Sequence, residues 1–254
     1  MQDSWETVTL AEKIPIQTIR QSPRLVPFLV GREATGLRAE WEMKPHEDWL
    51  TVRARGEDSE AFLNILKEKF GEAPVAQSSV ERWDVRKGFV TGSGKVGFGV
   101  YVDLGIIQPM RKDALYPLHR MRAQLADGLA RSSRDILAEN ALSDNFPVSV
   151  AVTDVEAGKV SVELTDETRD LLLSWRSRPF DRVIATGIDR DRVEKAVYST
   201  RLKLDVIEVQ SLSLLVQCLV CKVGTDAPGV ISKIGGRLRG VGLTAFQSPS
   251  RIKL

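Results

Sequence analysis

Two aromatic residues, Phe98 and Tyr101, lie in a glycine-rich stretch of the chain that has lysine and arginine residues nearby in sequence. Aromatic rings stack on the faces of unpaired bases, and cationic side chains bind the phosphate backbone of a nucleic acid. Gly97 and Gly99 remove side chains where a strand of a small barrel has to coil sharply. Residues 95–105 therefore predict a bent barrel strand that binds RNA. The candidate RNA-binding residues are Lys87, Phe89, Lys95, Phe98, Tyr101, Arg111, Lys112, Arg120 and Arg122.

The spacing of the two rings leaves two interpretations open. Residues three apart point to opposite faces of a regular strand. Phe98 and Tyr101 form one stacking surface if a bulge at the glycines realigns them. Without such a bulge, at least one ring belongs to the core of the barrel or to an interface between domains.

Other kinds of chemistry find little support in the sequence. Residues 92–97 fit the spacing GxGxxG, but a strand is predicted after them where a dinucleotide site needs a helix. No Gly-x-Ser-x-Gly motif is present, and the two histidines have no paired spacing that suits a metal. Cys218 and Cys221 lie three apart in a strand-like run, so we expect both to be buried on opposite faces. The sequence predicts that the protein is not an enzyme and has no catalytic residues, no metal site and no cofactor.

Composition and charge restrict the class of protein further. The chain has 254 residues and a net charge of +2, and it carries enough apolar residues for ordinary globular cores. Net charge rises from −3 over residues 1–75, through 0 over 76–165, to +5 over 166–254. A basic end suits a phosphate backbone, and an ordinary solvated surface explains it nearly as well. The apolar run 212–223 is too short to span a bilayer, and residues 1–6 do not resemble a secretory signal. We expect a cytoplasmic protein without a membrane segment.

Hydrophobic periodicity divides the chain into three parts and predicts the α+β class. Residues 1–75 read as strand, helix, strand, strand and helix, which is typical of a small α+β domain and compatible with a shortened ferredoxin-like plan. Residues 76–165 predict a barrel whose closing hairpin, at 146–164, follows a helical insertion at 111–142. Residues 166–254 predict a helix and then strand, helix, strand, strand, helix and strand, which is the ferredoxin-like order.

Three segments of the central part resemble the S1-type RNA-binding domains of the OB class. They are Lys87-Gly-Phe-Val90, Gly97-Phe-Gly-Val-Tyr-Val102 and the hairpin formed by 148–152 and 160–164. The resemblance implies a five-stranded barrel in which Phe98 and Tyr101 face RNA, with Lys87 and Phe89 as neighbours. The insertion at 111–142 departs from the family, in which a short loop usually occupies this place.

Over its full length the chain resembles a family of uncharacterised archaeal proteins with a central S1-like domain and a ferredoxin-like C-terminal domain. The segment Leu219–Gly229 carries part of this likeness. The order of domains is also similar to that in the alpha subunit of the archaeal initiation factor that delivers initiator tRNA. These resemblances imply an RNA-binding protein associated with the ribosome or with translation. Its implied partners are RNA, ribosomal RNA in particular, and ribosomal proteins.

Two alternatives come from the C-terminal part. Lys222, Thr225 and Gly229 belong to a turn and helix start that resemble ACT-type amino-acid-sensing domains, which implies an anion or ligand site at free N–H groups. A Pro-Gly turn that caps a helix explains the same residues. The second alternative is a protein-assembly adaptor that uses the apolar helix at 171–175. Our leading hypothesis is a non-enzymatic RNA-binding protein, with a regulatory small-ligand module or an adaptor as the alternatives.

Overall fold

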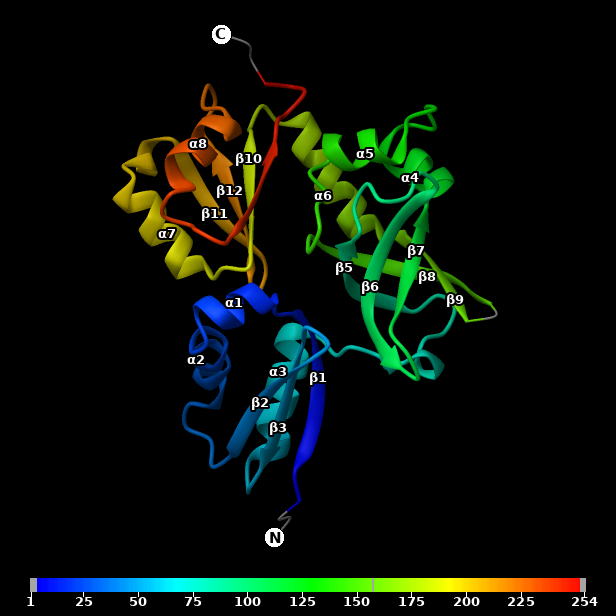
Figure 1. The fold of residues 1–254 in the computed structure, drawn as a ribbon, viewed down its shortest axis with the longest axis vertical. Coiled ribbons are helices and arrows are strands. Elements are labelled where there is room, and N and C mark those ends of the chain that lie inside the picture. The colour runs from blue at the N-terminus through cyan, green and yellow to red at the C-terminus, as the bar shows by residue number, and fades with distance from the viewer. Residues whose placement is uncertain (1–3, 157, 252–254) are drawn as a thin grey trace.

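The computed structural model describes residues 4–156 and 158–251 and consists of three units. Figure 1 shows an N-terminal sheet with its helices at the bottom, a barrel at the upper right, and a C-terminal sheet with its helices at the upper left. The mixed α+β class is confirmed. Among the described residues, none of the helices combines the length and the apolarity that crossing a bilayer requires.

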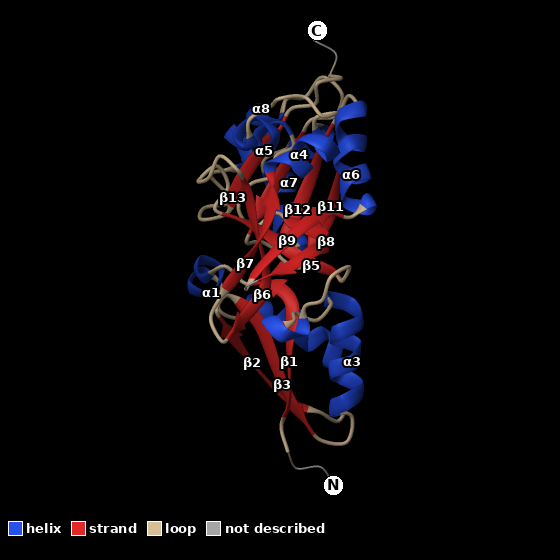
Figure 2. Cartoon of the chain, turned by 90° about the vertical axis from the view of Figure 1, so that its right-hand side faces the viewer, coloured by secondary structure: helices blue, strands red, loops and turns tan. Residues whose placement is uncertain are grey.

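The N-terminal unit is a three-stranded antiparallel sheet with a helix on one face. Its elements are β1 (Glu6–Lys13), α1 (Ile16–Gln21), α2 (Leu25–Gly31), β2 (Glu40–His46), β3 (Trp49–Arg55) and α3 (Ser59–Phe70). The strand order is β1-β3-β2, and α3 lies along one side of the sheet (Figure 2). Phe62, Leu66 and Phe70 recur at helical spacing and are buried between α3 and the sheet, as the sequence pattern predicts.

The central unit is a closed five-stranded barrel. Its elements are β4 (Val75–Ala76), β5 (Val85–Thr91), β6 (Gly99–Gln108), β7 (Lys112–Pro117), α4 (Leu118–Leu125), α5 (Ser133–Glu139), β8 (Pro147–Glu156), β9 (Lys159–Leu164) and α6 (Asp166–Ser177). The strands close in the order β5-β6-β7-β9-β8, with β8 paired back to β5. This barrel is compatible with an OB-like architecture. Ala157 of the expected β8–β9 turn lies outside the described residues.

The helical insertion is shorter than the predicted range 111–142. Residues 112–117 form β7, in which buried and half-buried side chains alternate. The apolar spacing of this segment also fits a helix, but pairing with β6 and β9 satisfies its backbone as a strand. The insertion therefore begins at Leu118, and Arg111 and Lys112 lie at the start of a strand instead of on a helix.

The C-terminal unit has the predicted order of strand, helix, strand, strand, helix and strand. Its elements are β10 (Arg182–Thr186), α7 (Arg190–Ser199), β11 (Val206–Ser213), β12 (Val216–Cys221), α8 (Ala227–Ile234) and β13 (Gly242–Phe246). They form an antiparallel sheet in the order β11-β12-β10-β13, with α7 and α8 on one face (Figure 1). Cys218 and Cys221 are buried on opposite faces of β12, as their spacing predicts, and burial raises the pKa of each thiol to about 12.

One apolar core joins the barrel to the second face of the C-terminal sheet. The Trp175 ring on α6 packs against the Phe146 ring, with 6.1 Å between their centroids, and against the Phe246 ring of β13, at 5.8 Å. In the segment 171–175, on which the adaptor alternative depends, Leu172 and Trp175 are buried in this core. Leu171 is the exposed apolar side chain of that segment.

The three units meet at Glu12, whose side chain on β1 is 2% exposed. Its Oε1 accepts a hydrogen bond from Lys87 Nζ of β5 at 2.5 Å. Its Oε2 accepts hydrogen bonds from the Ser213 hydroxyl and from the Leu214 N–H at 3.2 Å, in the β11–β12 hairpin. A buried carboxylate is costly unless donors replace the water that it loses. Glu12 finds these donors in the barrel and in the C-terminal unit.

A second buried carboxylate, Asp103 on β6, fastens the N-terminal unit to the barrel. Asp103 is 0% exposed, and its Oδ2 lies 2.9 Å from Lys13 Nζ and 2.6 Å from a guanidinium nitrogen of Arg111. Its Oδ1 accepts a hydrogen bond from the Gly105 N–H. Asp113 lies beside this group. Its own burial raises the pKa of Asp113, and the negative charge of Asp103 raises it further.

Replacing Asp103 by alanine leaves the buried Lys13 ammonium without its carboxylate. We expect Asp103→Ala to lower the free energy of unfolding by about 3–5 kcal/mol, the range for breaking a buried ion pair. Urea denaturation followed by tryptophan fluorescence measures this change. The matched control is Glu40→Ala, which removes an exposed pair with Arg55 and should cost about 0–1 kcal/mol. If both variants lost the same free energy of unfolding, burial would not be the reason that the Asp103 ion pair matters for stability.

Because the pKa of Asp113 is raised, we expect replacing this residue to change the Tm by an amount that depends on pH. The folded protein binds more protons at this carboxyl than the unfolded chain does, over the pH range just above its ordinary pKa of 3.8. The contribution of Asp113 to stability therefore falls as the pH rises through that range. We expect Asp113→Asn, which cannot ionise, to raise the Tm at pH 7 and to raise it less as the pH falls toward 3.8. Melting curves of both proteins across this range test the sign, and a lower Tm of the variant at pH 7 would be evidence against it.

Candidate nucleic-acid interface

Phe98 and Tyr101 meet on the outside of the barrel. Their ring centroids are 6.3 Å apart and their planes are perpendicular, at 90°. Phe98 is 55% exposed and immediately precedes β6, whereas Tyr101 is half-buried within the strand. Because regular alternation begins at Gly99, the spacing of three does not separate the rings. They form one surface, which we call the ring pair (Phe98 and Tyr101).

Backbone contacts hold Phe98 beside the two inserted helices. The Phe98 carbonyl accepts a hydrogen bond from the Leu118 N–H at 2.8 Å, at the start of α4. The carbonyl of Val96 accepts one from the Ser133 hydroxyl at 3.0 Å, at the start of α5. The insertion thus supports the segment that carries the exposed ring.

Lys95 is exposed in the β5–β6 loop that leads to the ring pair. This loop is fastened by the Ser93 N–H, which donates a hydrogen bond to Asp144 Oδ1 at 2.7 Å. A groove of about 450 Å³ lies between the loop, α5 and the edge strand β13. Its lining includes Ser93, Gly94, Arg134, Leu137, Thr244 and Ala245. Arg134 places positive charge on this groove, and the exposed Lys95 follows Gly94 of its lining in the chain.

Three other basic residues that the sequence predicts to bind RNA lie away from the ring pair. Lys87 and Arg111 belong to the buried ion pairs with Glu12 and Asp103. Lys112 pairs with Ile106 in the far half of β6 from Phe98, and its Nζ donates a hydrogen bond to a glutamine side chain at 2.6 Å. The structure does not bring these three cations together with the rings.

The predicted role of Phe89 is wrong. Its side chain is 1% exposed and packs edge-on against Trp49 of β3, with 5.7 Å between ring centroids. The outer face of β5 is covered by the N-terminal unit at this point, so Phe89 is an interface residue and cannot stack on a base.

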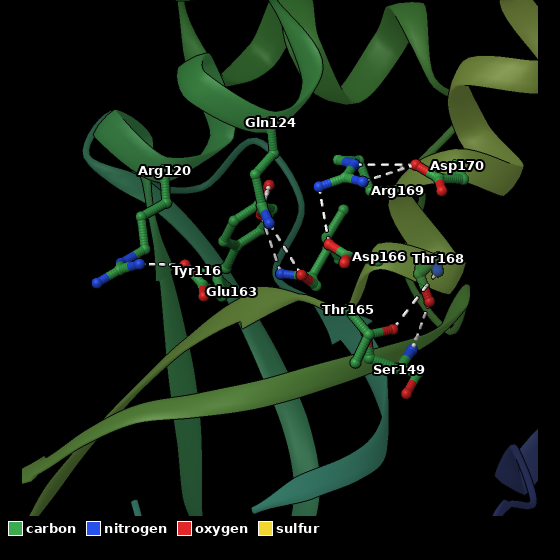
Figure 3. Close-up of polar contacts among 11 residues, drawn as sticks. Tyr116, Arg120, Gln124, Ser149, Glu163, Thr165, Asp166, Thr168, Arg169 and Asp170 are labelled. Carbon is green, nitrogen blue, oxygen red and sulfur yellow. Dashed lines mark hydrogen bonds and ion pairs between the residues drawn. The ribbon is translucent and has the colours of Figure 1, made fainter. Parts of the chain in front are cut away.

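Arg120 and Gln124 fasten α4 to the barrel (Figure 3). Arg120 forms an ion pair with Glu163 of β9. Gln124 Oε1 accepts hydrogen bonds from the Tyr116 hydroxyl at 2.9 Å and from a backbone N–H of β9 at 3.0 Å. Burial raises the pKa of Tyr116, so its hydroxyl keeps the proton that it donates. Arg122 Nε donates to a backbone carbonyl in the loop that follows α4, at 2.8 Å. Arg120 and Arg122 thus have structural partners of their own.

The turn that resembles ACT-type domains is occupied by side chains of the protein. Asp226 Oδ1 accepts a hydrogen bond from the Gly229 N–H at 2.6 Å, and Asp181 accepts one from the first N–H of α8 at 3.2 Å. Lys222 is exposed and Thr225 is half-buried beside the turn. The turn therefore caps the helix, and these two N–H groups are already used.

The buried carboxylates at the junction do not form a metal site. Glu12 and Asp103 are each surrounded by ammonium, guanidinium, hydroxyl and N–H donors. In the part of the chain that the structure describes, no three side chains of His, Cys, Asp or Glu are grouped so that they could hold an ion.

Gly97 and Gly99, on either side of Phe98 in the sequence, differ in whether the structure has space for a side chain. A Cβ on Gly99 would lie 2.4 Å from the Tyr116 carbonyl oxygen, whereas nothing lies within 4 Å of a Cβ on Gly97. Because the obstructing atom is backbone, we expect Gly99→Ala to lower the free energy of unfolding by about 1–3 kcal/mol. Gly97→Ala is the matched control and should change it by less than about 0.5 kcal/mol. Urea denaturation of both variants measures the difference, and equal losses would show that close strand approach is not the cause.

Two family models match consecutive parts of the chain. The DUF2110 central domain matches residues 80–176, which span the barrel and most of α6. The DUF2110 C-terminal domain matches residues 180–245, which span the four-stranded sheet. No curated protein matches the chain. Because the two domains of one family follow each other and together cover well over half of the sequence, the chain belongs to the DUF2110 family.

Proposed function

We propose that this protein is a non-enzymatic RNA-binding protein that acts in association with the ribosome or with translation. The observation that carries the proposal is the ring pair, in which an exposed phenylalanine and a half-buried tyrosine contact each other on the outside of a barrel. An exposed ring at the start of a barrel strand is suited to stacking on an unpaired base, which is worth about 1–3 kcal/mol per base.

We further assign the barrel to the OB class, of S1 type, on its strand order. β6 and β7 are its second and third strands, and OB folds bind oligonucleotides on this face. The sheet order β11-β12-β10-β13 supports a ferredoxin-like C-terminal unit. The N-terminal unit follows a shortened form of this plan. Its order is β1-β3-β2, and Glu72 bridges Leu10 of β1 where a fourth strand would lie.

The proposed RNA path follows from the cations that remain available. Lys87 and Arg111 are engaged at the junction between units, so phosphates do not run across them. Lys95 is exposed in the loop before the ring pair, and Arg134 lines the adjoining groove. A single strand would stack on Phe98 and continue past Lys95 toward α5.

The alternatives have weaker support. A ligand module at α8 would need N–H groups that Asp226 and Asp181 already occupy. An adaptor surface on α6 would have Leu171 as its exposed apolar side chain, because Leu172 and Trp175 are buried. The ring pair is the feature that favours RNA over both.

Truncating the exposed ring tests the proposal. We expect Phe98→Ala to weaken binding of a single-stranded RNA oligonucleotide by about 1–3 kcal/mol and to leave the Tm nearly unchanged. Tyr198→Ala is the matched control, because Tyr198 is an exposed aromatic residue on the C-terminal unit. Phe89→Ala is the opposite control and should lower stability by about 3–5 kcal/mol. Fluorescence anisotropy and melting curves on the same samples separate these effects.

The salt dependence of binding provides a second measurement. Affinity should fall steeply with salt, and Lys95→Ala should flatten the slope of log K against log [salt] by about 0.7 if that lysine contacts a phosphate of a single strand. Failure to bind RNA at low salt, or equal affinities of the Phe98 and Tyr198 variants, would remove the support for the ring pair.

A further inference from the structure

Two segments of the chain that contain no aspartate or glutamate lie against each other in the fold. Residues 14–32 carry three arginines, residues 227–254 carry three arginines and two lysines, and neither segment has an acidic residue. They meet where the loop between α8 and β13 packs on α1, so closely that a Cβ on Gly240 would collide with the Gln21 side chain. The Thr18 hydroxyl of α1 also donates a hydrogen bond to a backbone carbonyl just after β10, at 2.9 Å. The fold thus joins basic segments of two units.

Five exposed arginines gather around this contact. Two come from α1 and the residues after it, and two come from the loop between α8 and β13. The fifth, Arg192 of α7, joins them because its Nη1 donates a hydrogen bond to the Ser22 hydroxyl at 2.6 Å. None of the five has an ion pair among the residues that the structure describes, whereas the neighbouring Arg190 pairs with Glu194. We call them the arginine cluster (Arg20, Arg24, Arg192, Arg237 and Arg239).

The arginine cluster keeps a net positive charge when the carboxylates beside it are counted. Asp191 is exposed next to Arg192 in the chain, and Asp48 lines a hollow next to the cluster. Five arginines less these two carboxylates leave a charge of +3. Like charges on one surface repel each other and attract a polyanion, and the planar guanidinium group matches the geometry of a phosphate. This surface therefore fits a chain of phosphates.

A hollow of about 330 Å³ connects the arginine cluster to the groove beside the ring pair. Strand β13 borders both, because Gly242 at its start lines the hollow and Thr244 lines the groove. On the barrel side, Asn145 lines the hollow and Ser143 lines the groove. β13 is an outer strand of its sheet, and Figure 2 shows it above α1 along one side of the molecule. The groove and the hollow therefore follow each other along β13, from α5 to α1.

We propose that the arginine cluster is a second contact for the single-stranded RNA that the ring pair binds. One strand would run along β13 and cross from the barrel to the C-terminal and N-terminal units, with a base on Phe98 and phosphates on the arginines. This inference rests on the proposed function for the identity of the ligand. A single OB fold binds about 4–16 nucleotides, so RNA length decides whether a strand reaches beyond the barrel. The cluster should therefore matter for long RNA and not for short RNA.

The experiment measures binding of the full chain to oligouridylates of four and twelve nucleotides, the short RNA and the long RNA, by fluorescence anisotropy at several salt concentrations. We expect the long RNA to bind more tightly. The double variant Arg237→Gln/Arg239→Gln should weaken its binding about tenfold or more at about 0.1 M salt. It should also flatten the slope of log K against log [salt] by about 1.4, since each phosphate contact on a single strand contributes about 0.7. The double variant Arg20→Gln/Arg24→Gln, on the other unit, should have the same effect, and neither should change binding of the short RNA.

The matched control is Arg201→Gln/Lys203→Gln, which removes two exposed cations beyond the far end of α7 and should bind both RNAs as the parent protein does. Equal affinities for the two RNAs, or long-RNA binding that both cluster variants leave unchanged, would overturn the second contact and leave the ring pair in place. Equally tight binding of a twelve-residue polyglutamate peptide would also overturn it, because the cluster would then bind any polyanion. Loss of long-RNA binding in the cluster variants but not in Phe98→Ala would support the cluster and contradict the ring pair.

Discussion

Glu12 and Asp103 are carboxylates withdrawn from water, and the three units are arranged around the donors that replace that water. Glu12 takes its donors from the barrel and from the C-terminal hairpin, and Asp103 takes a lysine from the N-terminal unit. A buried ion pair loses its compensation when its partners separate. These two charges therefore restrict the relative placement of the units, together with the apolar core that the barrel shares with the C-terminal sheet.

This placement decides which face of the barrel stays open. The N-terminal unit covers the outer side of β5, so that Phe89 packs against Trp49 and Lys87 turns to Glu12. On another side, α6 and the C-terminal sheet share a core with the barrel. The start of β6 remains uncovered, and the inserted helices hold it by hydrogen bonds to the carbonyls of Val96 and Phe98. The exposure of the ring pair is thus a consequence of where the neighbouring units lie.

Local patterns predicted the elements of the C-terminal unit and the opposite orientation of Cys218 and Cys221, because alternation and helix caps are properties of neighbouring residues. The same patterns placed β7 in a helix, since its apolar spacing fits both periods and the choice depends on pairing with β6. Local patterns could not show that Phe98 is exposed and Phe89 is buried, because an aromatic ring is suited both to stacking on a base and to packing in an interface between units.

Local patterns could not predict the contacts of Glu12 and Asp103 that join the three units. An acidic residue inside an apolar strand, as Asp103 is between Val102 and Leu104, signals a buried pair without naming its partner. The partners of Glu12 lie 75 and 201 residues away along the chain. Separations of this size leave no spacing signal in a single sequence, so these partners of Glu12 could not be predicted from it.

The aromatic contacts of Trp175 with Phe146 and Phe246 have a consequence for how the family's two domains are defined. The family boundary falls between residues 176 and 180, yet the core runs straight across it from the barrel into the C-terminal sheet. A cut at that boundary would expose the faces of three large rings on two fragments, each with an apolar surface and no partner. The two matched segments therefore share one apolar core, and the boundary between them does not separate two independently packed units.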